Sequence, residues 1–160
     1  NWDVGSVTDM EAMFFSAETF NQDIRLWDVG NVTNMARMFE GATMFNPPAL
    51  AWAVTTVTNM KSMFENATNF NGRMGGWNVS SVTNMRKMFA RASSFNRVIK
   101  SWNVNNVTNM NAMFFEATSY NKDLSNWTPR VNPNVTDCAN FSNGTPGWVQ
   151  PKPSFSFCTP

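Results

Sequence analysis

Hydrophobic residues recur along this chain with a constant period. Tryptophan stands at every twenty-fifth position without an insertion or deletion, at Trp2, Trp27, Trp52, Trp77, Trp102 and Trp127. A valine, two methionines, a phenylalanine, an alanine and a second aromatic residue keep the same spacing behind the tryptophans. Self-similarity at such a period is typical of a solenoid, in which each repeat buries its apolar side chains against its neighbours.

Within one repeat, the apolar residues follow the periodicity of a helix. Val32, Met35, Met38, Phe39 and Ala42 fall within an arc of about 120° on a helical wheel. The residue before each valine is Ser, Asn or Thr, and these residue types favour a helix N-cap. The pattern therefore predicts helices over 7–17, 32–42, 57–67, 82–92 and 107–117, with N-caps at Ser6, Asn31, Thr56, Ser81 and Asn106.

A short extended run that ends in Trp-x-Val follows each predicted helix. One short strand and one short helix per repeat predict an α/β solenoid, with a parallel sheet on one side and helices on the other. The asparagine after the second aromatic residue is expected to form a ladder, because its amide can bond turn backbone in the neighbouring coil. These asparagines are Asn21, Asn46, Asn71, Asn96 and Asn121.

The repeat decays near the C-terminus. We divide the chain into five solenoid repeats over 1–127 and a degenerate sixth repeat with a Pro-rich cap over 128–160. Val135, Cys138 and Phe141 continue the apolar columns of the repeat after a shift of three residues. Proline cannot continue a helix, so the remainder is expected to fold back over the end of the stack as a cap.

The chain has two cysteines, Cys138 and Cys158, and both lie in this C-terminal part. The absence of CxxC spacing and of histidine argues against a zinc or redox site. We expect a structural disulfide within the cap, with two buried free thiols as the alternative. A disulfide would indicate an oxidising, secretory compartment.

The first repeat begins in mid-phase. Trp2 and Val4 open a layer with no repeat before it in the sequence. Such an end would leave a few hundred Å² of apolar surface in water, which monomeric proteins rarely tolerate. We expect a preceding segment or a neighbouring chain to bury this end.

The motif W-x-V-x-x-V-T-N-M-x-x-M-F-x-x-A-x-x-F-N, read in residues 27–46, resembles the BspA-like leucine-rich-repeat surface proteins. The resemblance covers about residues 1–127. It implies a leucine-rich-repeat-like fold, display on the cell surface or outside the cell, and a role in adhesion or surface layers. That family has no common enzymatic activity or ligand site, so the resemblance assigns no functional residue.

Charge is distributed unevenly, although the formal net charge is only +1. Residues 1–65 hold eight acids and three bases, whereas residues 66–115 hold six bases and no acid. The basic region predicts a binding surface for anionic glycans or acidic proteins, with a merely solvated face as the alternative. Its candidate residues are Arg86, Lys87, Arg91, Arg97 and Lys100.

The sequence gives little support for an enzyme, a metal-binding protein, a membrane-spanning protein or a nucleic-acid-binding protein. The chain has no histidine and no paired carboxylates, which argues against an enzyme, a cofactor and a metal site. No apolar run is long enough to span a membrane, and no pattern of nucleic-acid binding is present. Among the N-x-Ser/Thr sequons, Asn66, Asn134 and Asn143 are the best candidates for glycosylation.

Two functions remain for a secreted protein of this kind. The first is an extracellular or cell-surface binding and adhesion module. The second is a structural protein that assembles into a larger extracellular structure, in which the open first repeat would allow self-association.

Overall fold

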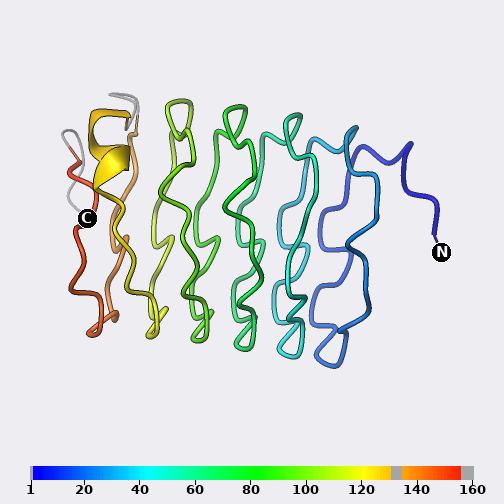
Figure 1. Ribbon diagram of the computed structural model, residues 1–160, viewed down its shortest axis with the longest axis horizontal. Helices are drawn as coiled ribbons and strands as arrows, with labels where there is room; N and C mark the ends of the chain where they lie inside the picture. The colour runs from blue at the N-terminus through cyan, green and yellow to red at the C-terminus, as the bar shows by residue number, and fades with distance from the viewer. Residues whose placement is uncertain (1, 131–134, 156–160) are drawn as a thin grey trace.

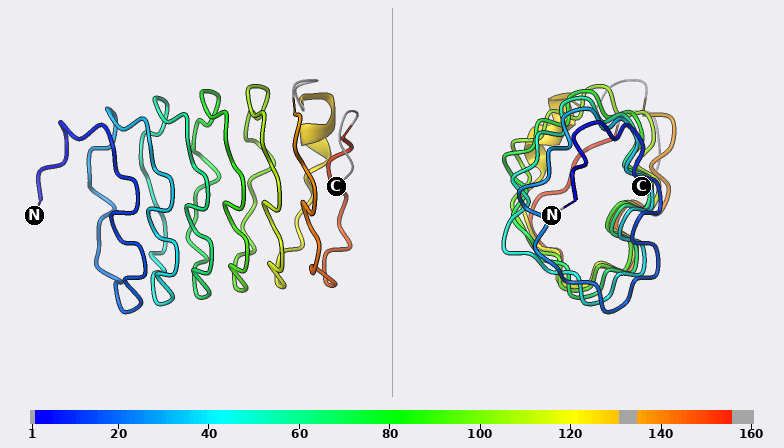
Figure 2. Two further views of the ribbon diagram at one scale, coloured as in Figure 1. Left: turned by 180° about the vertical axis from the view of Figure 1, so that it is seen from behind. Right: turned by 90° about the vertical axis from the view of Figure 1, so that its right-hand side faces the viewer.

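The computed structural model describes residues 2–130 and 135–155. The chain winds into coils that stack along one axis, so that its first and last described coils lie at opposite ends of the stack (Figure 1). The coils nearly superimpose when they are viewed along the axis (Figure 2). Isolated parallel bridges join Asp9 to Asn34, Asn34 to Asn59, and so on through Asn84 and Asn109 to Asp137. Up to Asn109, these bridges keep the same spacing as the tryptophans, so one coil corresponds to one repeat.

The predicted α/β solenoid, with one strand and one helix per repeat, is wrong. The only helix in the described residues is the 3₁₀-helix η1 (Ser125–Arg130). Strand pairing in the same part of the chain is limited to isolated bridges, so the described residues form no sheet. Tight turns replace the helices predicted over 7–17, 32–42, 57–67, 82–92 and 107–117.

Left-handed backbone conformations explain why these segments are not helical. We number positions in every coil by the residues of the first coil. Position 12 has a φ between 53° and 59° in every coil, and position 16 has a φ between 54° and 76°. A left-handed residue cannot continue a right-handed helix, so each one ends a turn. These residues are Ala12, Arg37, Ser62, Lys87, Ala112 and Asn140 at position 12, and Ser16, Gly41, Asn66, Arg91, Glu116 and Gly144 at position 16.

The backbone amides released from a helix pair between coils instead. In the first coil, Met10 donates to the Asn34 carbonyl at 2.9 Å, and Ser16 donates to the Glu40 carbonyl at 2.7 Å. The amides at positions 12 and 14 likewise donate to carbonyls of the next coil. The same four bonds join every pair of neighbouring coils, and the last of them runs from the Glu116 amide to the Asn143 carbonyl. We call this set the amide ladder. The amides between its members close turns within their own coil, as Met13 does with Met10.

Side chains add two further links between coils. The predicted asparagine ladder is confirmed, because each Oδ1 accepts the amide of the equivalent residue one coil later, as Asn46 Oδ1 does from Asn71 at 2.9 Å. The other members, Asn21, Asn71, Asn96 and Asn121, accept amides in the same way. The predicted N-caps are wrong. Asn31, Thr56, Ser81 and Asn106 donate to backbone carbonyls of the preceding coil.

Three columns of stacked aromatic rings fill the core. The Phe39 and Phe64 rings stack with centroids 5.6 Å apart, and the Phe45 and Phe70 rings stack at 6.0 Å. The tryptophans form the third column, and Trp52 Nε1 also donates to the Ile24 carbonyl at 3.0 Å. Each ring is thus covered by the ring of the next coil, which one repeat alone cannot achieve.

Residues 135–155 close the described part of the stack. Val135, Cys138 and Phe141 are buried, and the Phe114 amide donates to the Phe141 carbonyl at 2.8 Å. The segment after Trp148 folds back, since the Leu124 amide donates to the Pro151 carbonyl at 2.9 Å. Cys138 is not a free thiol but is disulfide-bonded. The partner expected from the sequence, Cys158, lies outside the described residues.

We expect Gly41→Ala to lower the free energy of unfolding by about 1 kcal/mol. Gly41 holds a left-handed φ of 73°, and an added Cβ would lie 3.4 Å from the Ser16 Cα. Gly76→Ala is the matched control, because a Cβ there would meet nothing within 4 Å. Chemical denaturation of both variants tests this, and equal midpoints would contradict it.

We expect Tyr120→Phe to raise the free energy of unfolding by about 1 kcal/mol. The Tyr120 hydroxyl is buried without a hydrogen-bond partner among the described residues, and the four preceding coils carry phenylalanine at this position. Burial raises the pKa of this hydroxyl, as expected for a desolvated phenol. The reverse change at the same position one coil earlier, Phe95→Tyr, should destabilise the protein. Thermal unfolding checks this: the melting temperature should rise for Tyr120→Phe and fall for Phe95→Tyr.

Candidate functional site

The five candidate basic residues come from two different parts of the fourth coil. Arg86, Lys87 and Arg91 stand at positions 11, 12 and 16, within the segment of the amide ladder. Arg97 and Lys100 follow the second aromatic residue, where the chain returns towards the next tryptophan. Lys87 and Arg91 line one hollow and Arg97 lines another. The single five-residue patch remains a prediction, and we call Arg86, Lys87 and Arg91 the basic cluster.

Lys87 and Arg91 line one hollow, together with Glu65, Phe115 and Asn140. Both are left-handed residues of their coil, with φ of 55° and 58°. Each pairs with a carboxylate of an adjacent coil. Lys87 Nζ lies 3.0 Å from Glu65 Oε1, and Arg91 Nε lies 2.8 Å from a Glu116 oxygen. The hollow is thus lined by cations that are partly neutralised.

The two carboxylates differ in their exposure to water. Glu65 is only 7% exposed, whereas the Arg91–Glu116 pair is open to solvent on both sides. The hydrogen bond that Arg91 Nε donates to Glu116 raises the pKa of the Arg91 guanidinium, which stays charged at every pH relevant to folding. Arg86 is exposed and makes no ion pair with a described residue. Arg86 therefore contributes the least compensated charge of the basic cluster.

Arg97 and Lys100 are held by local contacts. Arg97 Nε donates to the Asn71 carbonyl at 2.6 Å, and Arg97 lines a separate hollow with Arg73 and Val98. Lys100 forms an ion pair with Asp123. Hydrogen bonds from Lys100 and then Ser125 lower the pKa of Asp123 to about 2. Both residues thus have local structural partners. Arg97 and Lys100 therefore serve as control positions when binding by the basic cluster is tested.

Phe115 belongs to the same hollow and was missed in the sequence. The Arg91 guanidinium carbon lies 5.3 Å from the centroid of the Phe115 ring, and Arg37 stands over Phe15 in the same way at 4.4 Å. Over the first five coils, position 15 varies between phenylalanine, glutamate and alanine, while its neighbours at positions 13 and 14 are constant. Variation within a constant repeat is the signal that could have found it.

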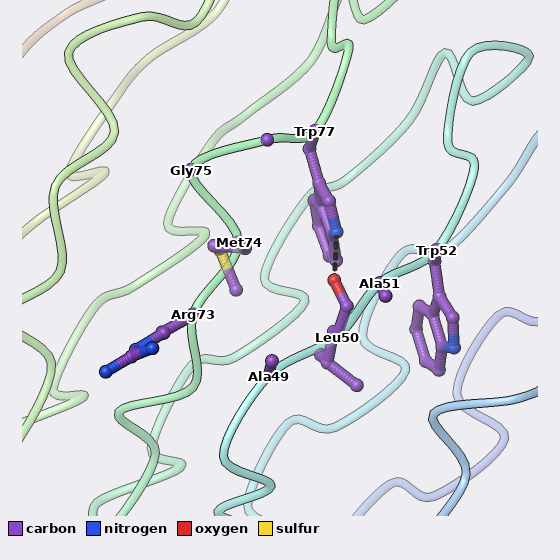
Figure 3. Close-up of a pocket in the computed structure, with 9 residues that line it drawn as sticks. Ala49, Leu50, Ala51, Trp52, Arg73, Met74, Gly75 and Trp77 are labelled. Carbon is purple, nitrogen blue, oxygen red and sulfur yellow. Dashed lines mark hydrogen bonds between the residues drawn. The ribbon is translucent and has the colours of Figure 1, made fainter.

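A second hollow lies between the second and third coils (Figure 3). It is lined by Ala49, Leu50, Ala51, Trp52, Arg73, Met74, Gly75, Gly76 and Trp77. Its two tryptophans are 5% exposed or less, and Trp77 Nε1 donates to the Leu50 carbonyl at 2.7 Å. The rings are occupied in the core and cannot stack on a ligand. We therefore assign this hollow no role in binding.

The described residues offer little for catalysis or a cofactor. No three acidic or cysteine side chains gather among them in a way that could hold a metal ion. Within the described ranges, no helix has the length and apolar character needed to cross a bilayer. The absence of an enzymatic activity therefore remains a prediction from the sequence.

The predicted modification sites fall in different surroundings. Asn66 is half-buried and left-handed, and its amide donates to the Ala90 carbonyl at 2.9 Å. Asn143 is exposed, and its Nδ2 contacts Asn140 Oδ1 at 3.4 Å. Asn134 lies outside the described residues, as does Cys158, while Cys138 is buried. Glycosylation of the three asparagines remains a prediction.

We expect Lys87→Gln to lower the free energy of unfolding by about 1–2 kcal/mol, because it removes the cation beside the buried Glu65 carboxylate. Adding Glu65→Gln should restore most of this loss, since two amides can bond each other. Arg86→Gln should change stability by less than about 0.5 kcal/mol, as an exposed charge without a partner. Urea denaturation of the three variants checks this. A double variant no more stable than Lys87→Gln alone would contradict it.

Comparison with known proteins gives one match. A family model described as Mycoplasma protein of unknown function, DUF285, matches residues 1–71 and 48–148. No curated protein and no solved structure matches the chain.

Proposed function

We propose, from the premise that this chain belongs to the DUF285 family, that it is an extracellular or cell-surface binding module for anionic glycans. The family's description assigns no activity, so the proposal rests on the residues of this chain. We propose further that the family is related to the BspA-like surface proteins, on the motif in residues 27–46. That relationship carries the expectation of display outside the cell.

The observation that carries the proposal is the basic cluster beside Phe115. Lys87 and Arg91 line a hollow with a half-buried aromatic ring, and the exposed Arg86 precedes Lys87 in the same coil. Sulfate and carboxylate groups bind arginine and lysine through charge-assisted hydrogen bonds, and an aromatic ring can pack against the face of a sugar. Glu65 and Glu116 neutralise part of this charge, so we expect moderate affinity that depends strongly on salt.

The test compares two charge-matched sets of substitutions in the presence of a sulfated polysaccharide such as heparin. Changing Arg86 and Arg91 to Gln, together with Lys87→Gln and Glu65→Gln, should weaken binding at least about tenfold. Changing Arg97 and Lys100 to Gln removes the same net charge and should leave the dissociation constant within about twofold. Isothermal titration at two salt concentrations gives both affinity and salt dependence.

Three outcomes would contradict the proposal. The protein does not bind the polysaccharide, or both sets weaken binding equally, or raising the salt concentration leaves the affinity unchanged. If the protein instead binds an acidic protein, and the first set of substitutions weakens that binding, the ligand class is different but the basic cluster is still the binding site. The alternative function, structural assembly, depends on a different surface.

A further inference from the structure

Positions 9 and 11 of the two middle coils carry polar side chains that lie side by side. They are Asn59 and Lys61 in the third coil, and Asn84 and Arg86 in the fourth coil. A parallel bridge joins Asn59 to Asn84, and the Ser62 amide donates to the Arg86 carbonyl at 2.8 Å. The two pairs are therefore in register, at the spacing of about 4.8 Å that separates parallel strands.

The donor groups of these four side chains have no acceptor among the described residues. Asn59 Oδ1 accepts the Lys61 amide at 3.1 Å, which leaves its Nδ2 group without a partner there. Asn84 Oδ1 accepts the Arg86 amide in the same way at 3.0 Å. Neither Lys61 nor Arg86 forms an ion pair within the described ranges. Arg86 is exposed and the other three are half-buried, and we call the four residues the central donor row.

The same two positions bind a carboxylate elsewhere in the stack. Asn109 Nδ2 donates to Asp137 Oδ2 at 3.2 Å, and Asn111 Nδ2 donates to Asp137 Oδ1 at 2.8 Å. Donors at positions 9 and 11 of one coil thus hold both oxygens of one carboxylate. The central donor row presents donors at these positions, but the coils on either side of it carry no acid there (Asn34, Ala36, Asn109 and Asn111).

We propose that the central donor row binds a carboxylate of the ligand, and that the ligand is a polysaccharide of uronic acids. This inference rests on the proposed function, which it narrows to carboxylated glycans. Lysine and arginine give a carboxylate charge-assisted hydrogen bonds, and the asparagine amides can donate to its remaining acceptor positions. Unlike Lys87 and Arg91, the two cations of the row have no carboxylate of their own in the described chain.

The central donor row is continuous with the hollow beside Phe115. Arg86 directly precedes Lys87, which lines that hollow. Asn111 also lines it, and stands at position 11 one coil after Arg86. A glycan chain that lies along the stack axis can therefore contact Lys61, Arg86 and the hollow together. Because linked contacts reinforce one another, affinity should rise with the length of the glycan.

The experiment measures binding of polygalacturonate, which carries carboxylates and no sulfate, by isothermal titration. Lys61→Gln should weaken binding at least about fivefold, because it removes a cation that no carboxylate of the described chain neutralises. Lys122→Gln is the matched control, since Lys122 is also half-buried and forms no ion pair with a described residue. It should leave the dissociation constant within about twofold.

Asn59→Asp tests the asparagine donor separately. Aspartate keeps an oxygen for the amide two residues on, as Asp9 does for Glu11 at 2.8 Å, but it replaces the donor with a negative charge. Binding should weaken at least about tenfold. Asn103→Asp is the control, because Asn103 accepts an amide in the same way and Asp28 does so at the equivalent position of the second coil. It should bind polygalacturonate within about twofold of the unmodified protein, and thermal unfolding shows that each variant keeps its fold.

Separate substitutions distinguish this inference from the proposed function. If Arg91→Gln weakens binding but Lys61→Gln and Asn59→Asp do not, the hollow binds the glycan and the inference is wrong. The reverse result would support the central donor row and not the hollow. Equal losses for Lys61→Gln and Lys122→Gln would overturn the inference, as would losses seen with dextran sulfate but not with polygalacturonate. If the unmodified protein binds neither polymer, the proposed function and the inference are both wrong.

Discussion

The amide ladder between coils is the interaction on which the rest of this structure depends. Each coil places four amides and four carbonyls at alternate positions from 9 to 16, and neither set can be satisfied within its own coil. Buried backbone groups that stay unpaired are costly, so one coil is unstable without its neighbours. The same bonds fix the register between successive coils, and this register aligns their aromatic rings and their asparagines.

The sequence predicted the columns of this protein correctly and its local backbone incorrectly. Periodicity reports which side chains face the core, and Met35, Met38 and Phe39 do face it. It does not distinguish a helix from two successive turns that bury the same side chains. The distinction lies in the left-handed residues, and Ser62 or Lys87 carries no sequence signal for that conformation. The residue types that point to it are the glycines Gly41 and Gly144 and the asparagines Asn66 and Asn140.

The candidate site shows the same division. Arg86, Lys87 and Arg91 were found because they are basic and close in sequence. Their surroundings depend on residues one coil away, since Glu65 is 22 residues from Lys87 and Glu116 is 25 residues from Arg91. The number of basic residues counted along the sequence therefore overstates the positive charge that a ligand would meet at this surface. In a stack of coils, charge is compensated along columns, and each column must be compared across repeats before a surface is called basic.

The side chains at position 9 follow the direction of the ladder. Each coil donates its ladder amides to the carbonyls of the coil that follows it, so the ladder runs in one direction along the stack. The side chain at position 9 is aspartate in Asp9 and Asp137 and asparagine in the coils between them. An asparagine amide both donates and accepts, so it can serve neighbours on two sides. A carboxylate only accepts, and Asp9 and Asp137 each take an amide from the inner coil beside them. An acid at this position therefore continues the column of side-chain hydrogen bonds as an acceptor only.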